Sequence, residues 1–89
     1  MTSQDFFNRA TALQARIIRG ESNETPVMAW AAVCRACANA SNAKRNEIAA
    51  IAGPVPSYTR AELNWFNNLE RVWWVARAQV ETLAEKAAA

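Results

Sequence analysis

The stretch TRAELNWFNNLERVWWVARAQVETLAEKA, residues 59–87, decides the fold because it holds both a helix start and a long apolar repeat. Thr59 and Glu62 have the spacing of the T-x-x-E capping box, which begins a helix. Apolar residues then recur at alternating spacings of three and four: Phe66, Leu69, Trp73, Ala76, Val80, Leu83 and Ala87. This alternation is the a/d pattern of a helix that packs along one seam. We therefore predict one helix from Arg60 to about Lys86.

Two further helical segments are predicted upstream, because glycine and proline fall only between apolar segments. The first covers about residues 3–19, with Thr2 or Ser3 as its cap and Gly20 after its end. Its buried stripe has a 4-3-4 spacing: Phe6, Ala10, Leu13 and Ile17. The second begins at Pro26, directly after the N-cap Thr25. It is apolar around most of its circumference as far as Ala38, so we expect it to be central and surrounded.

Residues 39–52 leave two alternatives open. In one continuous helix over residues 26–52, Arg45 would share a face with Val27, Cys34 and Ala38, and an unpaired buried arginine is costly. A break near Ser41 would let the second piece rotate, and serine and asparagine favour such breaks. The alanine content favours continuity instead.

The predicted fold class is all-α, a compact bundle of three or four helices with a long C-terminal helix, in a single domain over residues 1–89. A helix of 27 residues spans roughly 40 Å, against roughly 25 Å for the first helix. The C-terminal half is therefore expected to extend beyond the bundle. Its seam at Ala76, Val80 and Leu83 would then need another chain, which makes a homodimer through this helix one possible assembly.

The composition indicates a folded chain without a strong charge. Hydrophobic residues make up 52% of the 89 residues, enough for a core, although many are alanines, which bury little area. The formal net charge of +2 is too small to predict nucleic-acid or membrane binding from bulk electrostatics. The N-terminus has no signal-peptide pattern, and no apolar run reaches the roughly 18 residues of a membrane span. We expect a cytoplasmic protein without a membrane partner.

No catalytic pattern is present in the sequence. Histidine, the commonest general base and metal ligand, is absent, and both glycines stand alone, so there is no phosphate loop. Cys34 and Cys37 form a C-x-x-C, but inside a predicted helix with no strand before it, unlike a redox motif. Packing is the favoured interpretation, and a zinc site would need a second copy. We expect a protein that is not an enzyme and has no cofactor and no metal.

Residues 45–65 resemble a helix-turn-helix unit, with an apolar helix, a turn at Gly53 and a capped helix from Thr59. Two prolines lengthen the turn, and the second helix is too long for a typical recognition helix. An ordinary helical hairpin is the favoured interpretation, and DNA binding is the alternative. The candidate nucleic-acid contacts are Arg60, Lys44 and Arg45.

Trp73 and Trp74 cannot both enter the seam, because neighbouring helical residues point about 100° apart. With Trp73 in the seam, Trp74 points outward, with Arg71 and Arg77 in reach of its ring for cation-π contact. Either Trp74 packs at the rim of the bundle, or it belongs to a contact patch, since tryptophan and arginine are enriched at interface hot spots. The candidate partner-binding residues are Trp74, Arg71, Arg77, Val75, Asn64 and Asn67.

These observations favour binding over catalysis. We expect a non-enzymatic interaction protein that docks on another protein or nucleoprotein complex, as an inhibitor or an adaptor. Small inhibitors encoded by phages and mobile elements, including anti-CRISPR proteins, are often helical domains of this size, an analogy at the level of the fold alone. The alternatives are a DNA-binding regulator that uses residues 45–65 and a homo-oligomeric structural component held by the heptad seam.

Overall fold

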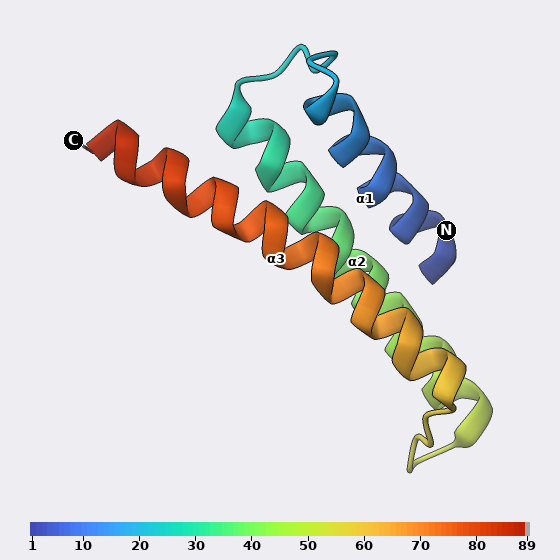
Figure 1. The fold of residues 1–89 in the computed structure, drawn as a ribbon. Coiled ribbons are helices and arrows are strands. Elements are labelled where there is room, and N and C mark those ends of the chain that lie inside the picture. Colours follow the sequence, from blue (N-terminus) through green and yellow to red (C-terminus); the bar gives the residue numbers. More distant parts are fainter. Residues whose placement is uncertain (89) are drawn as a thin grey trace.

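The computed structural model describes residues 1–88 and consists of three helices in up-down-up order (Figure 1). They are α1 (Ser3–Ile18), α2 (Pro26–Ala52) and α3 (Arg60–Ala88). The described residues contain no strand, which confirms the all-α prediction. The helix count lies at the lower end of the predicted three to four, and α3 is the longest helix, as expected.

Two of the three predicted helix starts and the stop at Gly20 are present as hydrogen-bonded caps, whereas Thr25, the N-cap of α2, makes no side-chain cap hydrogen bond. Thr2 caps α1 in a reciprocal box with Asp5, whose carboxylate accepts from the Thr2 N–H at 2.8 Å. At the other end Gly20 has φ of 72°, and the N–H of Glu21 donates to the Arg16 carbonyl at 2.9 Å, as in a Schellman motif. The box predicted at α3 is also confirmed, because the Thr59 N–H donates to Glu62 at 2.8 Å.

Helix α2 is continuous from Pro26 to Ala52, so the break considered near Ser41 does not occur. Arg45 does lie on the face predicted for a continuous helix, next to Ala38, but that face is open to solvent and Arg45 is exposed. The cost of burying an arginine therefore never arises. The expectation that α2 would be surrounded is wrong for the same reason, since one side of the helix is uncovered.

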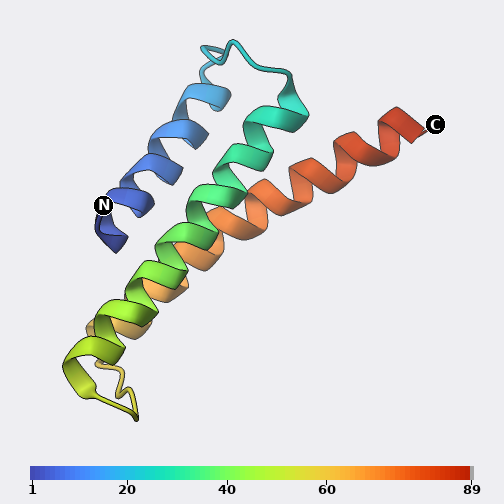
Figure 2. The ribbon, with the colours of Figure 1, turned by 180° about the vertical axis from the view of Figure 1, so that it is seen from behind.

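Helices α1 and α3 both pack on α2 and make few contacts with each other (Figures 1 and 2). The molecule measures 48 × 25 × 19 Å, and its radius of gyration is 14.8 Å. A compact chain of this length would have a radius of about 12 Å. The prediction of a compact bundle is therefore wrong: the structure is an elongated hairpin of α2 and α3 with α1 along one part of it.

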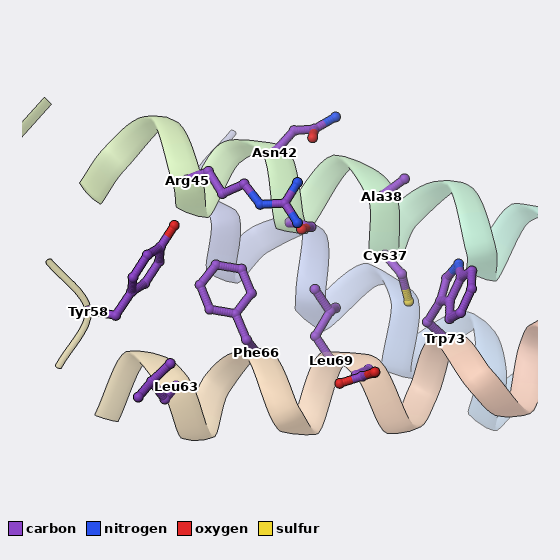
Figure 3. Close-up of a pocket in the computed structure, with 11 residues that line it drawn as sticks. Cys37, Ala38, Asn42, Arg45, Tyr58, Leu63, Phe66, Leu69 and Trp73 are labelled. Atoms are coloured by element: carbon purple, nitrogen blue, oxygen red, sulfur yellow. The ribbon is translucent and has the colours of Figure 1, made fainter. Parts of the chain in front are cut away.

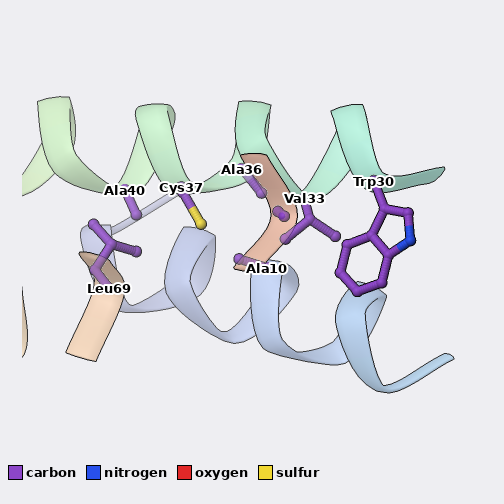
Figure 4. Packing of buried hydrophobic residues seen from close by; sticks show 8 residues of the cluster. Ala10, Trp30, Val33, Ala36, Cys37, Ala40 and Leu69 are labelled. Carbon is purple, nitrogen blue, oxygen red and sulfur yellow. The ribbon is translucent and has the colours of Figure 1, made fainter. Parts of the chain in front are cut away.

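The core is thin, because half of its fully buried positions are alanines (Figure 4). Those alanines lie on all three helices, at Ala10, Ala29, Ala36, Ala40 and Ala76. Val33 and Cys37 are the largest side chains with less than 2% exposure. Trp30 is buried in this centre, whereas other aromatic residues pack around it only partly buried, among them Phe6, Phe7, Trp65 and Trp73. Small residues let the helices approach closely but leave much apolar surface in contact with water.

The start of α1 is fixed to both other helices by polar contacts. Glu47 of α2 accepts the Ser3 N–H at 2.8 Å and the Ser3 hydroxyl at 2.7 Å. Trp65 of α3 donates its indole N–H to Gln4 at 3.0 Å and packs on Phe7 at a ring distance of 5.4 Å. These contacts set where α1 lies along the hairpin.

The seam of α3 is occupied within the chain further than predicted. Leu69 and Ala76 are buried, and Val80 and Leu83 pack partly buried against the same core. The expected overhang is therefore wrong for Val80 and Leu83, whereas the last turns of α3 do run past the start of α2 (Figures 1 and 2). Only the last turn of the seam, at Ala87, is exposed.

Candidate interaction site

The outward face of α3 carries an exposed stripe with spacings of three, four and three residues, formed by Asn64, Asn67, Arg71 and Trp74. We call these residues the outer stripe. Val75 lies beside it and is also exposed. All six predicted partner-binding residues are exposed, so the structure leaves each of them accessible.

Trp74 is the largest accessible side chain on this face, with 57% of its surface exposed. Its indole N–H donates to the Glu70 carboxylate one turn earlier at 3.2 Å. The ring of Trp73 meets it edge-on at a centroid distance of 4.9 Å. An exposed tryptophan is therefore held in one orientation, which lowers the entropy lost when it binds a partner.

Neither arginine beside Trp74 makes the predicted cation-π contact with its ring, since the cation-π contacts among the described residues are those of Lys44 with Trp65 and Arg77 with Trp73. Arg77 lies over the ring of Trp73, 5.7 Å from its centroid, and pairs with Glu81 at 3.0 Å. The predicted cation-π contact of Arg77 with Trp74 is therefore wrong, because the one-turn ion pair and the seam-side ring hold Arg77 on the other flank. Arg71 stays exposed on the outer stripe.

A groove of about 610 Å³ lies between α2 and α3 (Figure 3). Its α2 wall consists of Cys37, Ala38, Ser41, Asn42 and Arg45, and its α3 wall of Leu63, Phe66, Leu69, Glu70 and Trp73. Tyr58 lines one end, where its ring meets Phe66 edge-on at 5.8 Å. The groove is thus lined mainly by apolar and aromatic side chains, as ligand and partner grooves usually are.

The charged groups of the groove stand on opposite walls, Arg45 on α2 and Glu70 on α3. The guanidinium of Arg45 lies at the level of Phe66 and Leu69 (Figure 3). Within residues 1–88 the ion pairs join Arg19 to Glu21 and Arg77 to Glu81, so neither groove charge is neutralised by the chain itself.

Sequence patterns alone did not identify this groove, because it depends on how α2 and α3 are rotated against each other. Glu70 was not predicted as a site residue either. Glu70 and Trp74 are four residues apart on one helix, and this spacing indicates that their side chains are neighbours and can form a hydrogen bond.

The three candidate nucleic-acid contacts have different surroundings. The ammonium of Lys44 lies 5.0 Å from the ring of Trp65, while Arg45 lines the groove and Arg60 begins α3. Residues 45–65 contain the end of α2, the connection at 53–59 and the start of α3, and these two long helices run antiparallel (Figure 1), whereas a helix-turn-helix crosses at about 90–120°. The helical hairpin, the favoured interpretation of this segment, is confirmed.

The two cysteines have the environment of packed residues. Burial raises the pKa of Cys37 to about 11, and nearby Cys34 adds to the rise. Burial also raises the pKa of Cys34, against a smaller opposite effect of Arg77. Because the thiolate is the reactive and metal-binding form, both shifts disfavour redox and metal chemistry. Among residues 1–88, no three His, Cys, Asp or Glu side chains cluster as metal ligands.

Comparison with protein-family models, characterised proteins and solved structures found no match to this chain. None of the helices formed by residues 1–88 is long and apolar enough to cross a membrane.

Proposed function

We propose that this chain is a non-enzymatic interaction protein that docks on another macromolecule, a protein or a nucleoprotein complex, through the outer stripe of α3. The observation that carries the proposal is Trp74, a large aromatic side chain that is exposed yet held in place by Glu70 and Trp73. Tryptophan buried at the centre of an interface is among the strongest hot-spot residues, because it removes a large apolar area from water.

The neighbouring residues supply the polar rim that such a centre requires. Arg71 adds a cation that pairs with carboxylates or stacks on aromatic rings, and Asn64 and Asn67 offer both donors and acceptors. Val75 extends the apolar area beside Trp74. In its finer form the proposal is that docking blocks the partner, as small inhibitors of phages and mobile elements do, including anti-CRISPR proteins; that form depends on analogy of fold.

The test is an affinity capture from a lysate of the source cells, with and without nuclease, using wild type, Trp74→Ala and Ile51→Ala. Ile51 is a matched control, because it is an exposed large apolar residue at the far end of α2. We expect one defined complex that survives nuclease, is retained by Ile51→Ala and is lost or at least tenfold weaker with Trp74→Ala.

Two results contradict the proposal. If Trp74→Ala captures the same partner as well as the wild type, the outer stripe is not the docking surface. If only nucleic acid is recovered and nuclease removes it, the chain is a nucleic-acid-binding protein, and Arg60, Lys44 and Arg45 become the residues to change.

A further inference from the structure

The groove between α2 and α3 leaves part of the hairpin uncovered. Its lining includes Phe66, Leu69 and Trp73, side chains that ordinarily belong to a core. It does not include Trp74, so its occupant need not compete for the outer stripe of α3.

The accessible surface of the chain is larger than its mass accounts for. The structure exposes 6042 Å², whereas a compact monomer of 9.8 kDa exposes about 5,200 Å². The excess of about 840 Å² is close to the roughly 800 Å² that each partner buries in a stable protein interface. The chain therefore exposes enough extra surface to bury, in one protein interface of ordinary size, the area that each partner usually contributes.

The charges on the groove walls are complementary to those of a second copy. Arg45 stands on one wall and Glu70 on the other, and neither forms an ion pair within residues 1–88, although Glu70 accepts the indole N–H of Trp74. In a two-fold dimer, residue i of one copy contacts residue j of the other, and residue j of the first contacts residue i of the second. A surface with one cation and one anion can therefore pair its cation with the anion of the second copy, twice. An overall charge of only +2 per chain opposes this association weakly.

We propose that two copies of this chain associate face to face through the groove, with a two-fold axis along it. The α2 helix of each copy then lies on the α3 helix of the other, and all neighbouring helices are antiparallel. Because Arg45 lies at the level of Phe66 and Leu69, it meets Glu70 of the partner subunit, and this ion pair forms twice. The four long helices make one bundle, with α1 of each copy outside it.

This dimer differs from one held by the seam of α3 alone, since Val80 and Leu83 are used within each chain. It also goes beyond the proposed function, because it requires only a second copy and leaves the outer stripe free. A dimer would present two outer stripes.

The test is light scattering after size exclusion, together with sedimentation velocity, on wild type and on two charge reversals, Arg45→Glu and Glu70→Arg. We expect a wild-type mass of twice 9.8 kDa. Each single variant places like charges in both pairs, so its dimer should dissociate at least tenfold more readily. Mixed in equal amounts, the two variants should form a heterodimer, because both pairs are then restored with reversed sign.

Arg35→Glu and Glu85→Arg are the matched controls, since both residues are exposed on the same helices and lie outside the groove. Both controls should remain dimers. Circular dichroism checks the fold, and if a reversal unfolds the chain, Arg45→Gln and Glu70→Gln replace the reversals, with weaker dimers expected.

The proposal is overturned if the wild type stays monomeric up to its solubility limit. It is also overturned if the dimer survives both reversals, or if the mixed variants fail to associate, because the interface then lies elsewhere. Loss of partner capture with Trp74→Ala does not bear on this result. Because Glu70 also holds Trp74, Arg45→Glu, which leaves that hydrogen bond in place, is the variant that separates the two proposals.

Discussion

Glu47 is the single residue through which the first turn of α1 is bound to α2. Both of its carboxylate oxygens accept from Ser3, whose side chain is 2% exposed. Removing this acceptor leaves the buried N–H and hydroxyl of Ser3 without partners, and such a loss costs about 1–3 kcal/mol. Because Glu47 is itself near solvent, we expect the lower end of that range.

We therefore predict that Glu47→Ala lowers the free energy of unfolding by about 1 kcal/mol, a fall in Tm of roughly 4–8 °C for a chain of this size. The measurement is thermal unfolding followed by circular dichroism at neutral pH. Glu85→Ala, which removes an exposed acid from α3, serves as the control and should leave the free energy of unfolding within about 0.5 kcal/mol of the wild type. An unchanged Tm for Glu47→Ala would mean that water replaces the Ser3 contacts at no cost.

The same carboxylate predicts a pH dependence. The hydrogen bonds from Ser3 hold the pKa of Glu47 below its usual value near 4.5. The folded state thus prefers the ionised form, so this stabilisation is complete above about pH 5 and is lost as the pH falls through the lowered pKa. The difference in Tm between wild type and Glu47→Ala should be constant from about pH 5 to 8 and close at more acidic pH. A difference that persisted in acid would contradict a charge-assisted contact.

At the scale of the helix, α2 is continuous where serine and asparagine suggested a break. In an exposed helix interior, alanine is more stable than asparagine by about 0.6 kcal/mol and than glycine by about 1 kcal/mol. We predict that Asn42→Ala raises Tm and Asn42→Gly lowers it, in thermal unfolding at one fixed concentration. A break at this position would reverse the order, because asparagine and glycine favour non-helical backbone. Asn46→Ala, one turn later, is exposed outside the groove and should also raise Tm, so it tests the helix preference without touching the proposed interface.

Local patterns predicted the caps and the helices well, because each depends on residues within one or two turns. The T-x-x-E box at Thr59 and the stop at Gly20 are of this kind. Local patterns did not predict the exposure of Arg45 on α2, because that exposure depends on how much of the helix α1 and α3 cover. Among the site residues, the exposure of Trp74 followed from the seam by simple geometry. The groove did not, because no pattern within one helix fixes the rotation of α3 against α2.

A further prediction tests the alternative hypothesis that the chain forms a homo-oligomer through the seam of α3. Val80 and Leu83 pack against the core of their own chain. A charge at Val80 should therefore destabilise the fold, and we predict that Val80→Asp costs about 1–3 kcal/mol. Ala87→Asp, at the exposed end of the same seam, should have little effect on stability. Thermal unfolding measures the loss of stability, and light scattering measures the loss of the dimer. If the wild type is a dimer and Val80→Asp is a stable monomer, the dimer is held by the seam of α3 instead.

For the molecule as a whole, a core in which half of the buried hydrophobic residues are alanines leaves the isolated chain with little stabilisation from burial. Dimerisation through the groove adds Phe66 and Trp73 of both copies to one shared core. Folding is then linked to association, so the stability of the chain depends on its concentration.

We predict that the Tm of the wild type rises by about 4 °C for each tenfold increase in concentration, since the unfolding entropy of two chains converts about 1.4 kcal/mol into a shift of that size. Arg45→Glu should show a lower Tm that does not depend on concentration over the same range. Differential scanning calorimetry measures both. A wild-type Tm that stays constant while scattering shows a dimer would mean that each chain folds alone and associates afterwards, because linked folding requires the two equilibria to move together.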